Sequence, residues 1–343
     1  MVGPTDVLFD ELSSSDLAHL LSLSHKTIDL CLNSLHFVLN VPKTPSKPLQ
    51  LLHPSFRGFL LDENRCVDRR FFREKSEIHE NLFFGCLEVM SSSLTRNICL
   101  LPTPGSPPHS ISQAVLSKKL PKHLRYACQY WAEHLRHLKP IFASKYLHAI
   151  TLERFFKENF LNWIEFMSLL GRLTQAVLMV TSILNLIQDC NFVLEAQKQR
   201  LGSLVGDAYR FIQSYRSVIE IAPLQVYASA LVFSPVHSLM RQIYTREMPT
   251  WLRSSLVRHG RWDKCLLTLE SSGDTISSLA VSDDNNYLAC GMSHGPSKYG
   301  IQRPAPYKVR YRIARVVSCL WHFHERMCLH RLTRLLISNS LIQ

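Results

Sequence analysis

The sequence predicts a mainly α-helical protein, with an N-terminal winged helix, an antiparallel helical array and a short β-hairpin near residues 262–291. Three observations lead to this fold class. Through residues 66–250, apolar side chains recur at steps of three and four, which is the spacing of one helix face. The breaks between these segments are short, and short breaks favour antiparallel neighbours. Within residues 275–291, apolar and polar residues alternate around a polar turn, as in two paired strands.

The N-terminal 65 residues are predicted to form the winged helix. Ser13 and Asp16 mark one helix start, because a serine N-cap and an acid in the first turn favour helix initiation. Ser24 is suited to cap a second helix. Residues 37–41 and 49–53 then read as two strands around a turn that contains three prolines.

The middle of the chain, residues 66–250, is predicted to be a helical linker domain. A proline- and serine-rich stretch at 96–117 is expected to be a connecting loop. We expect Gly171 to end the most aromatic helix, since glycine is common at helix C-termini. The predicted helices cover residues 74–90, 120–135, 152–171, 174–188 and 207–221.

The aromatic and histidine side chains in residues 120–137 are each compatible with either a ligand-binding role or a structural role. Tyr126, Tyr130 and Trp131 are of the kind that stack on bases, but their helical spacing favours the protein core. His134 and His137 are three residues apart and suited to share a metal. No third ligand with suitable spacing accompanies them, so we expect a solvated helix face and no metal site.

Charge is concentrated at the C-terminal end of the chain. The net charge is +12, and residues 292–343 carry two lysines and seven arginines against the single acid Glu325. In residues 1–65, seven acids outnumber five basic residues, whereas a DNA-binding face needs a basic excess. We therefore do not expect the winged helix to bind nucleic acid, although the basic tail keeps a nucleic-acid-binding alternative open.

Catalytic and targeting motifs are not recognisable. None of the twelve glycines begins a G-x-x-x-x-G-K-[ST] loop, and no G-x-S-x-G or nucleophile–base pair is found. We therefore expect no enzymatic activity, no cofactor and no metal. The longest apolar run, 176–187, is too short to span a membrane, and residues 1–10 do not form a signal peptide. Ten cysteines without a C-x-x-C pair predict reduced thiols and a cytoplasmic location.

Several segments resemble the fungal NACHT–WD-repeat proteins, which are vegetative-incompatibility signalling proteins of the STAND NTPase type. The resemblance extends from about residue 5 to residue 291 and implies a winged helix at 1–65, a helical linker at 66–250 and a partial first WD repeat at 251–291. It also implies that 292–343 is a poorly ordered basic tail unrelated to the family. The segments that carry it are LLHPSFRGFLL at 51–61, the helix at 120–135, APLQVYASALVFSP at 222–235, and residues 262–291.

The resemblance also suggests one binding residue, His53. In the family, a histidine at the strand-to-helix junction of the winged helix contacts the bound ADP, and His53 matches that position. A neutral imidazole is able to donate a hydrogen bond to a phosphate oxygen. The alternative is a partly buried histidine that only caps the junction. The nucleotide role requires a NACHT domain, whose phosphate-binding loop this chain lacks.

The family's organisation implies a non-catalytic regulatory and interaction fragment. Such a fragment would couple a nucleotide-switch domain to a WD-repeat sensor, with the NACHT domain and the WD propeller as protein partners. A single partial repeat cannot form a propeller, because a blade needs neighbours to bury its faces. We therefore expect a truncated family member. The alternative function is nucleic-acid binding through the winged helix and basic tail.

Overall fold

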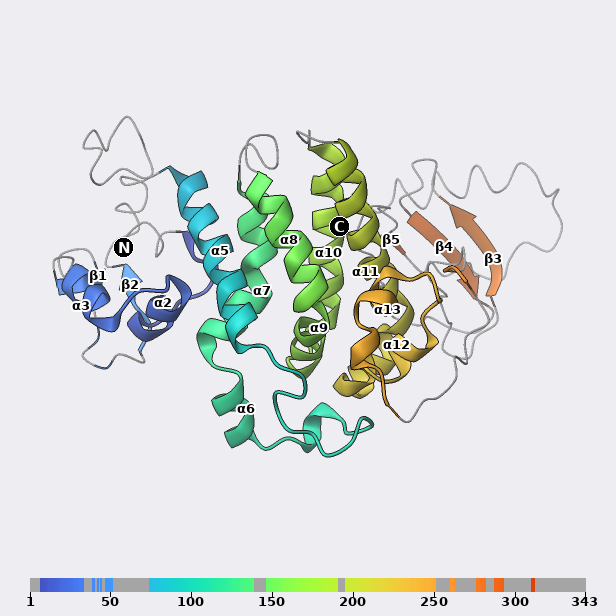
Figure 1. Ribbon diagram of the computed structural model, residues 1–343, viewed down its shortest axis with the longest axis horizontal. Coiled ribbons are helices and arrows are strands. Elements are labelled where there is room, and N and C mark those ends of the chain that lie inside the picture. Colours follow the sequence, from blue (N-terminus) through green and yellow to red (C-terminus); the bar gives the residue numbers. More distant parts are fainter. Residues whose placement is uncertain are drawn as a thin grey trace. The chain divides into compact units, whose positions relative to one another are not determined.

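The fold is mainly helical, as the sequence predicts (Figure 1). Contacts divide the chain into two compact units, Met1–Lys264 and Cys265–Gln343. No helix in the described part of the chain is long and apolar enough to cross a bilayer. The computed structural model describes residues 7–33, 39–40, 42, 44, 47–51, 74–138, 146–190, 195–250, 260–262, 276–281, 287–292 and 310–311.

The N-terminal part contains two short helices and a pair of short strands. Helix α2 (Ser14–Leu20) begins with a capping box: the Asp16 N–H donates to Ser13 Oγ at 3.1 Å, and the Ser13 N–H donates to the Asp16 carboxylate at 3.2 Å. The Thr27 N–H donates to Ser24 Oγ at the start of α3 (His25–Asn33). Strands β1 (Leu39–Asn40) and β2 (Gln50–Leu51) pair antiparallel. Residues 52–73 lie outside the described part, so the winged helix as a whole stays a prediction.

The longer helices of the described part of the chain form the array (Figure 1). Two of the predicted helices have wrong boundaries. The segment predicted as one helix at 152–171 is two helices that meet at Asn159, whose N–H closes the first helix on Phe155. The helix predicted to start at residue 207 starts at Glu195, because polar residues at its beginning hid the helical pattern. The helices are α5 (Lys75–Ser93), α7 (Lys122–Arg136), α8 (Tyr146–Glu158), α9 (Phe160–Leu169), α10 (Leu173–Asp189) and α11 (Glu195–Ile221).

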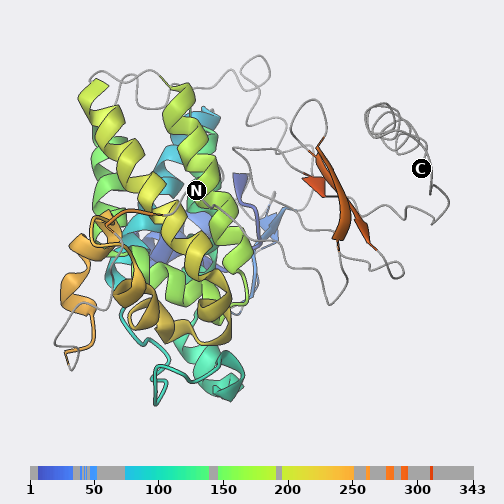
Figure 2. The same cartoon turned by 90° about the vertical axis from the view of Figure 1, so that its right-hand side faces the viewer.

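The connection between α5 and α7 is not wholly irregular. It holds the 3-10 turn η1 (Pro108–Ser110) and the helix α6 (Gln113–Lys119), where a loop was predicted. The Ser112 side chain caps α6 by accepting the Val115 N–H, which is the local signal that the proline-rich composition obscured. Both views place α6 beyond one end of the array (Figures 1 and 2).

The core of the array is aromatic. Trp131 and Trp163 are fully buried and pack edge-to-face, with ring centroids 5.7 Å apart. Tyr126 is buried and Tyr130 packs against the core, so the core reading of these aromatics is confirmed. Trp163 Nε1–H donates to the Cys128 carbonyl at 2.9 Å, which ties α9 to α7 through the core.

Two glycines are required by their geometry. Gly171 has φ +65° and ends α9, as predicted from the sequence. Gly85 lies in α5 against the backbone of Leu20 at the end of α2. A Cβ atom at Gly85 would overlap with the carbonyl oxygen of Leu20, so only glycine fits there without a shift of the backbone.

Among the described residues that follow α11 in the first unit, four short elements are present. They are the 3-10 turn η2 (Pro223–Val226), the helices α12 (Ser229–Phe233) and α13 (Leu239–Ile243), and the 3-10 turn η3 (Thr245–Glu247). The 222–235 motif therefore forms a turn and a short helix. Leu224, Val226 and Tyr227 of this motif are buried.

The second unit contains three described strands. Strand β3 (Ile276–Val281) pairs antiparallel with β4 (Tyr287–Met292), and the register shifts between Ile276 and Ser278. The short strand β5 (Arg310–Tyr311), within the predicted basic tail, pairs parallel with β4. Most of residues 292–343 lie outside the described part of the chain, as does much of the predicted WD repeat at 251–291.

Candidate functional site

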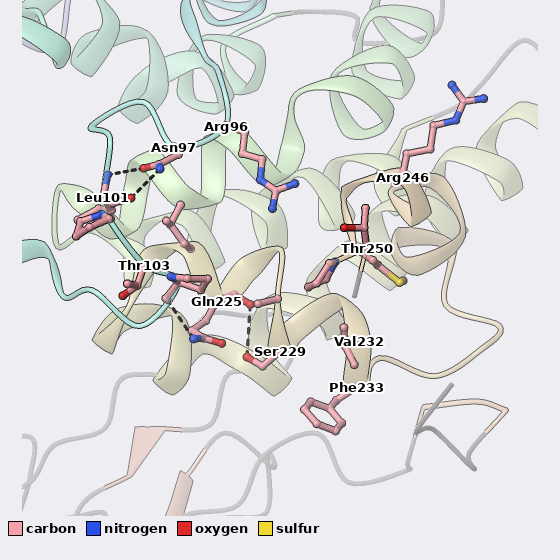
Figure 3. Close-up of a pocket in the computed structure, with 16 residues that line it drawn as sticks. Arg96, Asn97, Leu101, Thr103, Gln225, Ser229, Val232, Phe233, Arg246 and Thr250 are labelled. Carbon is pink, nitrogen blue, oxygen red and sulfur yellow. Dashed lines mark hydrogen bonds between the residues drawn. The ribbon is translucent and has the colours of Figure 1, made fainter. Parts of the chain in front are cut away.

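A groove of about 680 Å³ lies between the start of the α5–α7 connection and the elements after α11 (Figure 3). The described residues that line it include no histidine, cysteine or carboxylate, so they supply no general base, thiol nucleophile or carboxylate metal ligand. Apolar side chains and a few amide, hydroxyl and guanidinium groups line it instead. The lining residues are Arg96, Asn97, Leu101, Pro102, Thr103, Pro104, Leu224, Gln225, Ala228, Ser229, Val232, Phe233, Arg246, Met248, Pro249 and Thr250.

The buried side chain of Glu165 in α9 holds one wall of the groove in place. Its carboxylate accepts the N–H groups of Asn97 at 2.9 Å and Ile98 at 3.1 Å, and the Tyr227 hydroxyl at 2.7 Å. Glu165 is only 1% exposed. Burial raises its pKa, and the three donated hydrogen bonds oppose that rise. Glu165 therefore holds the loop and the 222–235 motif together.

Arg96 and Asn97 shape the loop above this anchor. Arg96 Nη1 donates to the Glu247 carboxylate at 2.9 Å, and its guanidinium lies 4.7 Å from the centroid of the Tyr227 ring. Asn97 has φ 53°, a conformation that asparagine tolerates well. Its side chain accepts the Leu101 N–H at 2.7 Å and donates to the Leu101 carbonyl at 2.9 Å. This end of the groove is thus preformed.

The 222–235 motif forms the opposite wall. Gln225 Nε2 donates to the Pro104 carbonyl at 3.1 Å, which links the two walls (Figure 3). Phe233, at the end of α12, is 53% exposed on the groove. A preformed, mainly apolar groove with a few oriented polar groups suits a bound apolar segment better than a chemical reaction. Periodicity did not reveal it, because its walls come from loops far apart in sequence.

The N-terminal part docks on the array through Asp16. The N–H of His123, in the first turn of α7, donates to Asp16 Oδ1 at 3.1 Å, and His123 Nδ1 lies 3.3 Å from the same oxygen. Burial raises the pKa of Asp16, but hydrogen bonds from His123 and Ser13 outweigh burial and lower it to about 2. The Asp16 carboxylate therefore caps α2 and also holds the start of α7.

A chain of hydrogen bonds lies close to this contact. The Phe9 N–H donates to the Tyr126 hydroxyl at 3.4 Å, and Tyr126 Oη lies 2.9 Å from His134 Nε2. His134 Nδ1 lies 2.9 Å from His79 Nδ1 of α5. The Phe9 ring stacks on His79, with centroids 6.1 Å apart. The segment before α2 is thus joined to α5 and α7.

The predicted solvated position of His134 is wrong. His134 is fully buried, and burial beside His79 and His137 lowers its pKa to about 3. His134 follows Trp131 by three residues and Ala127 by seven, so the helical period already placed it on the buried face. His137 lies partly exposed, with Nε2 3.4 Å from Glu133 Oε1. In the described ranges, no three metal-binding side chains come together.

The other end of the first unit is tied to α11 by Asp207. Trp262 Nε1–H donates to Asp207 Oδ1 at 2.6 Å. Asp207 Oδ2 accepts the Ser238 hydroxyl at 2.7 Å and the Met240 N–H at 2.8 Å, at the start of α13. Nothing in the sequence near Asp207 pointed to this contact, since its partners follow 31 to 55 residues later.

His53, the predicted nucleotide-contacting residue, lies outside the described residues. His53 is therefore not included in the site. Of the residues singled out in the sequence, the structure brings together Tyr126, Tyr130 and His134, and it places the 222–235 motif on the groove.

Comparison with known proteins gives an informative similarity. The chain is 36% identical over 216 residues to the vegetative incompatibility protein HET-E-1 of Podospora anserina. The matched part is 61% of this chain but only 15% of HET-E-1, so the chain spans a small fraction of its relative. No protein-family model matches the sequence. No solved structure matches it.

Proposed function

We propose that this chain is a non-catalytic regulatory segment of a NACHT–WD-repeat signalling protein, in which it couples a nucleotide-switch domain to a WD-repeat sensor. The similarity to a vegetative incompatibility protein carries the proposal, because it spans more than half of this chain. The motifs quoted above resemble the same class of protein. We place the protein in the cytoplasm, where thiols such as the buried Cys86, Cys99 and Cys128 stay reduced.

The two aspartate contacts support a coupling role. Asp16 joins the N-terminal helices to α7, and Asp207 joins Trp262 to α11. The part of the chain that resembles a winged helix and the part that resembles the entry to a WD repeat are therefore both hydrogen-bonded to the helical array. Both contacts are made to the same set of packed helices, which is the physical connection that a coupling role requires.

The groove supports the interaction half of the proposal. Exposed Phe233 and the neighbouring apolar residues of the 222–235 motif offer a preformed surface for a protein segment. We propose that the protein partner of this surface is the NACHT domain of the family.

The test measures binding of the full chain to a purified NACHT domain of this family, with ADP or ATP present, by isothermal titration calorimetry. We expect affinity that depends on the nucleotide and falls about tenfold in Phe233→Ser, since a lost apolar anchor costs about 1–3 kcal/mol. The matched control is Leu178→Ser, which changes an exposed leucine of α10 that does not line the groove. Absence of binding, an equal loss in the control, or ATP hydrolysis by the chain alone would contradict the proposal.

A further inference from the structure

A second pocket, of about 440 Å³, lies beside the Phe9 contact and is distinct from the groove. It is formed by the segment before α2, the first half of α7 and the turn between α9 and α10. Its volume is in the range of small-ligand sites. The described lining residues are Asp10, Lys122, Arg125, Tyr126, Gln129, Tyr130, Leu170 and Arg172.

The pocket gathers positive charge. Lys122, Arg125 and Arg172 are exposed, and in the described part of the chain none of the three forms an ion pair. Asp10 contributes the one carboxylate among the described lining residues, and it accepts the neighbouring Glu11 N–H at 2.9 Å. Three cations against one carboxylate leave an excess of positive charge that an anionic ligand would neutralise.

Hydrogen bonds fix the backbone segments that carry these three cationic residues. Lys122 and Arg125 lie in the first turn of α7, whose end is held by Asp16 through the His123 N–H. Arg172 follows Gly171, and its own N–H donates to the Met167 carbonyl at 2.8 Å. The partly buried Tyr130 lines the same pocket. Preorganised backbone lowers the entropy cost of holding a ligand.

We propose that this pocket binds the phosphate groups of a small polyanion, either a free phosphate compound or the headgroup of a phosphorylated lipid. Arginine guanidinium groups recognise phosphate oxygens in pairs, and the nearby lysine adds a point charge. The polar hydroxyl and amide groups of Tyr130 and Gln129 line the same space. The pocket is far smaller than a nucleic-acid duplex, so a small phosphate group fits it better.

The test uses the full chain and two probes at low ionic strength, where surface electrostatics are least screened. The first probe is inorganic pyrophosphate, followed by isothermal titration calorimetry. The second is a phosphatidylcholine vesicle that contains a phosphatidylinositol phosphate, followed by co-sedimentation. Saturable binding to pyrophosphate identifies a free compound as the source, and binding to vesicles alone identifies a lipid headgroup.

Three variants decide whether the pocket is responsible. Arg172→Gln should weaken binding on the order of tenfold, because it removes one charge-assisted hydrogen bond to the ligand. Arg154→Gln is the matched control, because Arg154 is an exposed arginine of α8 that does not line the pocket. Asp10→Asn is expected to strengthen binding severalfold by removing the opposing charge. A gain of affinity cannot come from misfolding.

The proposal is overturned if neither probe binds saturably. It is also overturned if Arg154→Gln weakens binding as much as Arg172→Gln, since net charge alone would then explain the binding. Equal binding by Asp10→Asn and the unchanged chain would likewise contradict it, because Asp10 lines the pocket.

Discussion

The Nδ1 atoms of His79 and His134 lie 2.9 Å apart in the interior of the helical array. One of these nitrogens must donate and the other accept, so the pair is compatible with two neutral rings but not with two imidazolium ions. If Tyr126 donates to His134 Nε2, the proton of His134 lies on Nδ1 and points to His79. This arrangement gives each group in the chain from Phe9 to His79 a donor or an acceptor.

This pair predicts a loss of stability in mild acid. The folded-state pKa of His134 is lowered to about 3, below its ordinary value of 6.5, so the unfolded chain binds more protons between these two values. The stabilising contribution of neutral His134 should therefore be fully present above pH 6.5. As the pH drops from 6.5 towards 3, the free energy of unfolding should decrease by at most about 1.4 kcal/mol per pH unit.

Urea denaturation of the full chain between pH 7 and pH 4 measures this dependence. His134→Gln should flatten it, whereas His109→Gln, at an exposed histidine, should leave it unchanged. The window stays above the ordinary pKa of Asp16, whose stabilising effect is lost only as the pH falls from 3.8 towards 2. An unaltered slope in His134→Gln would refute the assignment.

Replacing Glu165 by glutamine should destabilise the protein. The amide would turn a donor towards groups that already donate, and it would leave a buried hydrogen bond unmade, at a cost of about 1–3 kcal/mol. Thermal and chemical denaturation measure the change, and Glu158→Gln, at an exposed acid of the same region, serves as control. Tyr227→Phe removes one of the three donated bonds and should cost less than Glu165→Gln.

Gly85→Ala should destabilise the contact between α2 and α5. The added methyl group would meet the Leu20 carbonyl oxygen, a backbone atom that cannot turn aside, and overpacking of this kind costs about 1–3 kcal/mol. Gly206→Ala in α11 provides the opposite control, since nothing lies within 4 Å of its Cβ position. That variant should gain about 0.5–1 kcal/mol from helix propensity. A similar effect of both substitutions would show that α2 does not pack as described.

The Asp207–Trp262 contact should be visible as an energetic coupling. Asp207→Asn weakens the charged hydrogen bond from the indole, and Trp262→Phe removes its donor while keeping an aromatic ring. A double-mutant cycle on the free energy of unfolding should give a coupling of about 1 kcal/mol. Additive effects of the two substitutions would mean that the residues do not interact in solution.

Local patterns predicted much of the helical structure. Ser13 with Asp16, Ser24 before α3 and Gly171 after α9 each act within a few residues, so their roles could be read from the sequence. The break at Asn159 escaped prediction, because apolar residues continue on both sides of it. The N-terminal half of α11 was not predicted either, because it begins with a largely polar segment that shows no apolar helix face.

The sites were less accessible to sequence reasoning. His79, which contacts His134, and Trp262, which contacts Asp207, each lie 55 residues from their partner, and no local rule connects either pair. The 222–235 motif was recognised by resemblance, yet its place on the groove depends on Pro104 and Glu165 from other parts of the chain. Non-local contacts of this kind follow only from the packed structure.

Asp16 and Asp207 each perform two tasks with a single carboxylate. Asp16 completes the start of α2 while holding His123, and Asp207 supports the start of α13 while holding Trp262. Release of the distant partner therefore alters the electrostatics of a helix start, and fraying of that helix loosens the distant partner. The distant contact and the helix start that share each carboxylate should therefore be lost together rather than independently.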